Sequence, residues 1–268
     1  MKDRQVMQHS DRSPQSVSSH QIATIAAILG AIAVNALSNF FPLNGLSIGA
    51  ISNTLFGGVL VTPANYAFAI WGVIYLGLIA FGIYQVAPAQ RENVRLQKVR
   101  SPIIAASLLQ ILWVFAFQGR LFWLSVVIMI GILLSLVAAF LQLRKVDDRI
   151  SRTEKWLIQI PISVYFGWIT VASVVNIASA FYDSGWTGGG ISPAIWTVIL
   201  SAVSAAIAAV ITLRYRDVAF PSVIIWALVA IAIRQIGQSA LVMTALGLAI
   251  ALGLLILFVK FKPRALVQ

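Results

Sequence analysis

Long apolar runs separated by short charged segments dominate the pattern of hydrophobic and polar positions. A helix needs about 20 mostly apolar residues to cross the hydrocarbon core of a bilayer. Eight runs meet this requirement, so the pattern predicts an all-α integral membrane protein with about eight transmembrane helices. The predicted spans are residues 21–41, 64–86, 102–119, 121–143, 156–182, 193–213, 218–234 and 238–260.

These spans divide the chain into four parts. Residues 1–20 are rich in Ser, Gln and charge and show no apolar period, which predicts a disordered tail. Residues 21–182 hold the first five helices, with a long uncharged loop at 42–63. Three additional transmembrane helices occupy residues 183–260, and residues 261–268 form a second short tail.

The basic residues predict how the helices are oriented. Cytoplasmic loops of membrane proteins are enriched in Lys and Arg. In this topology all but two of the 19 basic residues, Arg120 and Arg234, fall on one side. Both termini are therefore expected in the cytoplasm, with the chain in the cell (inner) membrane. Counting 42–62 as a further span would place Arg91–Arg100 outside, so we interpret this segment as an external loop.

Composition narrows the classes of function. Only 10% of the residues are charged, against about 25% in a soluble domain. The net charge of +11 reflects loops on one side of a membrane, so no nucleic acid partner is expected. The chain has no cysteine, and its two histidines, His9 and His20, lie in the N-terminal tail. No metal site within the membrane and no required cofactor are therefore expected.

The predicted spans carry few ionisable groups. All eight acidic residues lie in tails, loops or helix ends. Ion-coupled transporters usually keep ionisable side chains inside their spans, so an ion-driven pump is disfavoured, as is an enzyme that uses a carboxylate pair. The spans contain Trp, Tyr, Phe, Asn, Gln and Ser instead. This lining suits a large, flat, mostly apolar ligand that is held by stacking and a few hydrogen bonds.

Three spans carry aromatic residues at helical spacing, alongside small or polar residues on the same face. The chain's second span, residues 64–86, follows Pro63, a residue that suits a helix start. The residues that share these faces are Trp71 and Tyr75 in the second span, Gln110, Trp113 and Phe117 in the third, and Tyr165, Trp168, Ala172 and Asn176 in the fifth.

These elements resemble the TspO/MBR family (tryptophan-rich sensory protein, or peripheral benzodiazepine receptor). That family carries Trp-x3-Tyr early in its second helix, Asn-x2-Trp with Phe a turn later in its third, and Pro-Tyr-x2-Trp-x3-Ala-x3-Asn in its fifth. The chain departs from the pattern at Gln110, where Asn is expected, and at Val164, where proline is expected. The resemblance covers about residues 21–182 and leaves three helices beyond the family's usual five.

The resemblance implies a five-helix bundle whose pocket is capped by the loop between the first two helices. It makes the nine residues of the three aromatic faces ligand-binding candidates, with Ala172 leaving room for the ligand. Family members are similar in binding porphyrins, haem and, in some members, sterols, and several are dimers. The expected function is a membrane receptor or carrier for a planar hydrophobic ligand such as a porphyrin or haem, with a sensory or tetrapyrrole-transport role. Expected partners are this ligand or a sterol-like lipid, membrane lipid, and a second copy in a homodimer.

Other interpretations stay open from the sequence. The chain could be a facilitated transporter or scaffold for small solutes, or an enzyme that degrades porphyrin, although no catalytic residue is indicated. Gln110 and Asn176 could bond neighbouring helices rather than a ligand, and Trp113 could serve bundle packing. Arg234 is expected to extend from its helix end toward water. The three C-terminal helices are expected to be a packing appendage.

Overall fold

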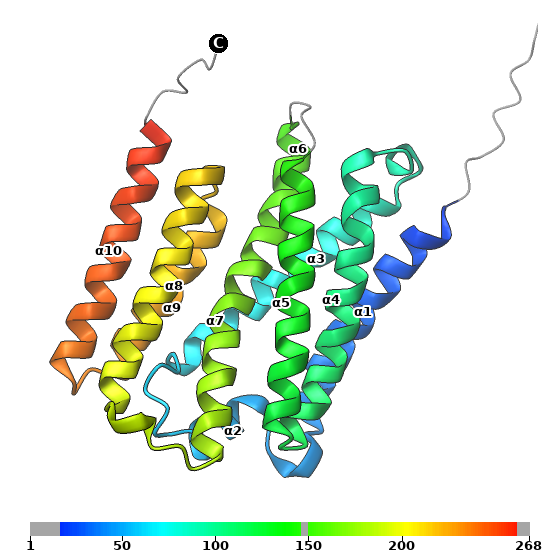
Figure 1. The fold of residues 1–268 in the computed structure, drawn as a ribbon. Coiled ribbons are helices and arrows are strands. Elements are labelled where there is room, and N and C mark those ends of the chain that lie inside the picture. Colours follow the sequence, from blue (N-terminus) through cyan, green and yellow to red (C-terminus); the bar gives the residue numbers. More distant parts are fainter. Residues whose placement is uncertain (1–16, 146–149, 262–268) are drawn as a thin grey trace, which may run out of the picture.

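The computed structural model describes residues 17–145 and 150–261, and nearly all regular structure in these ranges is helical. Eight long helices alternate in direction along the chain (Figure 1). Within the described ranges, seven helical segments are long and apolar enough to cross a membrane, and an eighth is a shorter apolar helix of 16 residues. The prediction of an all-α membrane protein with about eight helices is confirmed.

The helices follow the apolar runs, with short turns between them. The long helices are α1 (Ser19–Phe40), α3 (Ile70–Val86), α4 (Val94–Gln118), α5 (Phe122–Arg144), α7 (Ile160–Asp183), α8 (Pro193–Tyr215), α9 (Ala219–Arg234) and α10 (Ser239–Phe261). The short elements are α2 (Ile48–Thr54), α6 (Arg152–Glu154), a π-helical turn (Lys155–Gln159), and 3-10 turns at Leu43–Gly45, Asn65–Ala69, Pro88–Gln90 and Gly188–Gly190.

The helices pack in two connected groups. In the first group α4 lies against α1 and α5, α5 packs on α7, and α3 packs on α1 and α7. Helices α8, α9 and α10 form the second group, and α9 also packs on α7. A Cβ at Gly167 would lie 3.0 Å from the carbonyl oxygen of Phe220 and from the Cβ of Val223. Glycine at this position therefore lets α7 and α9 approach closely and join the two groups.

Helix α4 begins well before the predicted start at residue 102. Asn93 caps it, because the Asn93 side chain accepts hydrogen bonds from the backbone N–H groups of Arg95 and Leu96. The prediction of a loop before residue 102 is wrong for the residues from Val94 onward. Two of the charged residues there are buried: Arg95 forms an ion pair with Glu154 at 3.1 Å, and Arg100 donates to the side chain of Gln85. Paired cations can therefore lie inside the bundle at its end.

The 42–63 loop contains a short helix, α2, that the sequence did not predict. The Ser47 hydroxyl caps it by accepting a hydrogen bond from the N–H of Ala50. Ile51 and Phe56 in this loop are almost fully buried. The Phe56 ring lies 4.8 Å from the Phe122 ring in an edge-to-face contact. The loop is thus a folded part of the bundle, held by apolar burial.

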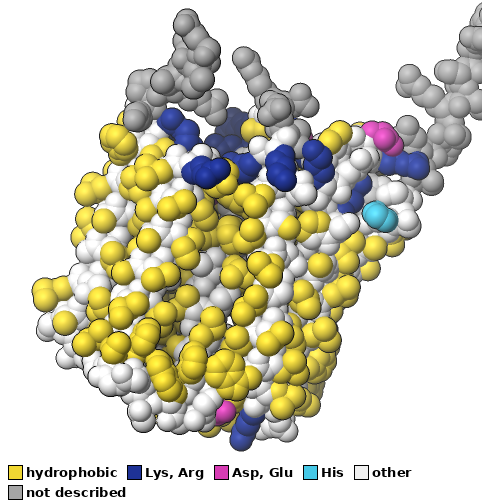
Figure 2. Space-filling view, in the orientation of Figure 1, with side chains coloured by type: hydrophobic (Ala, Val, Ile, Leu, Met, Phe, Trp, Pro, Cys, Tyr) yellow, Lys and Arg dark blue, Asp and Glu magenta, His cyan; other side chains and the backbone are white. Residues whose placement is uncertain are grey.

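Basic side chains gather at one end of the molecule, at the top of Figure 2. This basic end is where α1 and α4 begin and where α10 ends (Figure 1). Arg120 and Arg234 lie at the other end of the described part, next to the α4–α5 and α9–α10 turns. Most of the two predicted tails falls outside the described residues, and Ser19, predicted as tail, already belongs to α1.

Candidate ligand-binding site

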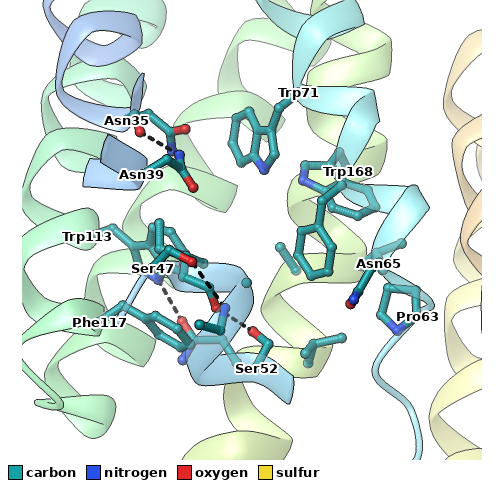
Figure 3. A pocket seen from close by; sticks show the side chains of 18 of the residues that line it. Asn35, Asn39, Ser47, Ser52, Pro63, Asn65, Trp71, Trp113, Phe117 and Trp168 are labelled. Atoms are coloured by element: carbon teal, nitrogen blue, oxygen red, sulfur yellow. Dashed lines mark hydrogen bonds between the residues drawn. The ribbon is translucent and has the colours of Figure 1, made fainter. Parts of the chain in front are cut away.

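A cavity of about 560 Å³ lies between α1, α3, α4, α5 and α7, under the 42–63 loop. Trp71 and Trp168 face Trp113 and Phe117 across it (Figure 3). The side chains along α7 that face the cavity include the small Ala172. Large aromatic side chains on several helices therefore surround one cavity, and the small side chain of Ala172 leaves space within it.

The aromatic side chains of the wall pack against each other in pairs. The rings of Trp71 and Tyr75 lie 5.3 Å apart, and those of Trp113 and Phe117 are stacked 5.0 Å apart. The Trp168 ring meets Phe68 edge to face at 5.9 Å. Such pairs fix the orientation of each ring. The wall is thus held in shape by its own side chains.

Asn176 ties three helices together beside the cavity. Trp113 Nε1 donates to Asn176 Oδ1 at 2.7 Å, and Asn176 Nδ2 donates to the hydroxyl of Ser125 at 2.9 Å. The side-chain amide of Asn176 therefore bonds residues of α4 and α5, which agrees with the alternative interpretation that Asn176 bonds neighbouring helices. Because Asn176 also lines the cavity, this network sets the position of the Trp113 ring in the wall.

Two polar atoms of the wall have no partner. The Tyr75 hydroxyl and Trp168 Nε1 are buried and form no hydrogen bond with any described residue. A buried polar atom without a partner costs roughly 1–3 kcal/mol. A ligand with a suitable donor or acceptor would recover that cost. Both side chains line the cavity, so a ligand there lies beside these two unpartnered groups.

Gln110 and Tyr165 do not reach the cavity. The Tyr165 hydroxyl donates to Gln110 Oε1 at 3.4 Å, and both side chains are almost fully buried. The Tyr165 ring lies 6.0 Å from that of Trp71, which does line the cavity. Seven of the nine candidates line the cavity. Gln110 and Tyr165 do not, and Tyr165 packs against Trp71, which does. The seven are Trp71, Tyr75, Trp113, Phe117, Trp168, Ala172 and Asn176.

Several polar residues of the wall were not predicted. Asn35 and Asn39 on α1 face the cavity, and the loop contributes Ser47, Ser52 and Asn53 (Figure 3 labels all but the last). The pair on α1 had a signal in the sequence, because two Asn residues spaced i, i+4 mark one face of an apolar helix. The loop residues had none. The site therefore combines aromatic side chains with polar side chains from α1 and from the 42–63 loop.

Arg234 does not extend freely into water as expected. Its Nη1 donates to Asn53 Oδ1 at 2.8 Å and to the carbonyl of Pro63 at 3.4 Å. Asn53 Nδ2 in turn donates to Asn65 Oδ1 at 2.7 Å. Asn53 and Asn65 both line the cavity. The end of α9 therefore holds α2 and the end of the 42–63 loop, which lie over the site.

Further bonds run from α9 to the same region. Trp226 Nε1 donates to the carbonyl of Ala67, and the N–H of Ala64 donates to the carbonyl of Ala230, each at 3.1 Å. The side chain of Gln235, just after the helix, donates to the carbonyl of Leu60 at 2.8 Å. The expectation of a mere packing appendage is therefore too narrow. Helix α9 positions the start of α3 and its aromatic residues.

Comparison with known proteins agrees with this architecture. The sequence model of a family described as TSPO-like protein matches residues 21–258. The match continues past residue 182, where the resemblance in the sequence motifs ended, and includes α8, α9 and most of α10. No curated protein and no solved structure matches the chain. Since the family match covers most of its length, the chain belongs to the family of TSPO-like proteins.

Proposed function

We propose that this membrane protein binds a planar hydrophobic ligand, such as a porphyrin or haem, in the cavity below the 42–63 loop. The observation that carries the proposal is the convergence of Trp71, Trp113 and Trp168, from three helices, on one hollow. Its volume of about 560 Å³ lies in the range of roughly 300–1,000 Å³ that is usual for small-molecule pockets. The resulting role is that of a receptor or carrier.

The chemistry of the wall supports this ligand class. Aromatic faces and edges offer stacking contacts worth about 0.5–1.5 kcal/mol each beyond the burial of area. The free atoms of Tyr75 and Trp168 can orient a ring nitrogen or substituent. Polar substituents would lie near Asn39 and Asn53. The chain has no cysteine, and no histidine lines the cavity among the described residues, so recognition there rests on ring contacts rather than on ligation of iron by these residue types.

A porphyrin titration tests the proposal. Protoporphyrin is added to the purified chain in detergent, and its own absorbance is followed so that changes in tryptophan content do not affect the readout. We expect saturable binding that weakens roughly tenfold or more in the Trp71→Ala, Trp168→Ala double variant, since two large contacts are lost. Trp123→Ala is the matched control, because Trp123 lies outside the cavity and is half exposed.

Three outcomes would separate the proposal from its alternatives. Binding that stays intact in the double variant, with folding verified by circular dichroism, would contradict this site. A solute flux in proteoliposomes without porphyrin affinity would support a small-solute transporter. Loss of the porphyrin spectrum over time in the dark, abolished by the same two substitutions, would support an enzyme.

A further inference from the structure

A second cavity, of about 980 Å³, lies at the basic end and shares no residue with the first. Its walls come from the beginnings of α3, α7 and α9, from the end of α5, from the π-helical turn, from the turn between α8 and α9, and from the end of α10. We call it the basic groove. It lies between the two groups of helices, so it belongs to neither group alone.

Charge gathers at one part of this groove. Among the described residues, four cationic side chains line it against one carboxylate, Asp217. Asp217 accepts hydrogen bonds from Arg144 at 2.5 Å, Ser163 at 2.8 Å and the N–H of Phe220 at 2.9 Å. Cations therefore outnumber carboxylates among the described residues of the groove. The four cations are Arg144, Lys155, Arg216 and Lys260.

Two of the four cations have no anion among the described residues. Lys155 and Lys260 form no ion pair and no side-chain hydrogen bond with other described residues. Arg144 pairs with Asp217 and packs on the Phe140 ring at 4.6 Å, and Arg216 donates to the backbone carbonyl of Val259. The described residues therefore supply no anion to Lys155 and Lys260.

The rest of the groove is apolar and faces the membrane. Val73 on α3 and Trp226 on α9 line it and are 58% and 38% exposed. Trp156, which is 60% exposed, lies at the basic end, the level at which tryptophan side chains meet lipid headgroups. A groove with cations at one end and hydrocarbon along its length matches a molecule that is anionic at one end and apolar along the other.

We propose that the basic groove binds an anionic phospholipid. Its phosphate lies between Lys155 and Lys260, beside the Arg144–Asp217 ion pair, and an acyl chain lies along Val73 and Trp226. Basic pockets between transmembrane helices hold anionic headgroups in this way. A free phosphate ion would leave the apolar wall bare, and a zwitterionic lipid would leave the positive charge uncompensated. The lipid joins α7, α9 and α10 where the two helix groups separate, independently of any ligand in the first cavity.

Native mass spectrometry of the full chain tests this proposal. The protein is released from mixed micelles that contain phosphatidylglycerol and phosphatidylcholine with identical acyl chains. We expect phosphatidylglycerol to be retained in preference. The Lys155→Gln, Lys260→Gln double variant should lose roughly tenfold in this preference, because each basic side chain near an anionic headgroup contributes to binding. Lys98→Gln with Arg214→Gln is the control, since both residues are exposed and outside the groove.

The outcomes divide clearly. Retention that falls equally in the control pair would mean that overall charge, not the groove, selects the lipid, and the proposal would be overturned. Equal retention of both lipids would overturn it as well. Competition separates the two sources of phosphate: if glycerol phosphate displaces phosphatidylglycerol as well as unlabelled lipid does, the site takes a free anion and the acyl chain has no part in it.

Discussion

Arg234 at the end of α9 donates a hydrogen bond of 2.8 Å to the side chain of Asn53 in α2, across 181 positions of sequence. Asn53 lines the aromatic cavity, whereas Arg234 belongs to the C-terminal group of helices. The bond therefore links the 42–63 loop, which lies over the candidate site, to helices outside the five-helix bundle. Those helices thus help to position the loop.

We expect Arg234→Gln to loosen the 42–63 loop. A hydrogen bond to a charged group contributes about 1.5–3 kcal/mol, so amide exchange in α2 should accelerate by roughly tenfold or more. Hydrogen–deuterium exchange of peptides that cover Ile48–Thr54 measures this. Arg214→Gln removes an exposed cation elsewhere and should leave the exchange unchanged. Unaltered exchange in Arg234→Gln would mean that apolar burial alone holds the loop.

Filling the cavity should block the ligand and preserve the fold. Ala172→Phe places a ring in the hollow, where the small side chain now leaves space. We expect porphyrin binding to be lost with little change in the thermal unfolding midpoint. Ala33→Phe on the exposed face of α1 is the control with the same change in volume. If both variants bind equally well, the ligand lies elsewhere.

The network at Asn176 makes a prediction about stability. Asn176→Ala leaves both Trp113 Nε1 and the Ser125 hydroxyl without their shared partner. Hydrogen bonds between membrane helices contribute about 0.6–2 kcal/mol, so we expect a loss of this size in the free energy of unfolding. Ser125→Ala removes only one of the two contacts and should cost less. Denaturation followed by circular dichroism in detergent measures both. Equal losses would show that the bond to Trp113 contributes nothing.

The buried ion pair between Arg95 and Glu154 makes a second stability prediction. Only 7% and 11% of these side chains are exposed, and Glu154 also accepts from Asn93. Glu154→Gln should destabilise the protein by roughly 1–3 kcal/mol, because Arg95 keeps its charge and loses its anion. Glu92→Gln is the matched control: its contact with Arg91 is 3.9 Å long and largely exposed, so it should cost about 0–1 kcal/mol. Similar effects of both substitutions would contradict the assignment.

The spans were predictable because lipid imposes a strong rule: a helix must be about 20 apolar residues long. The start of α4 was missed for the same reason, since Arg95 and Arg100 looked like loop residues until their buried partners were known. Those partners, Glu154 and Gln85, lie on other segments, 59 and 15 positions away in sequence. Helix α2 has only seven residues, too few for a periodic pattern to stand out.

The candidate site was predictable where a motif described it. Trp71, Tyr75 and Trp168 belong to short patterns on single helices, and they do line the cavity. Gln110 lies on the same helix face as Trp113, yet it does not line the cavity. The extent of the cavity depends on how the helices pack, which the sequence pattern does not reveal. The bond from Arg234 to the loop depends on how α9 packs, which no local pattern encodes.

The charge distribution predicts which end of the protein faces the cytoplasm. Basic side chains lie mostly at one end (Figure 2), and loops rich in Lys and Arg remain on the cytoplasmic side. The chain contains no cysteine, so single cysteines can report the topology without background. We expect Thr187→Cys, in the exposed turn between α7 and α8, to react with a membrane-impermeant maleimide on intact cells. Lys98→Cys, exposed near the basic end, should react only after permeabilisation. The reverse pattern would place both termini outside and would invert the proposed orientation.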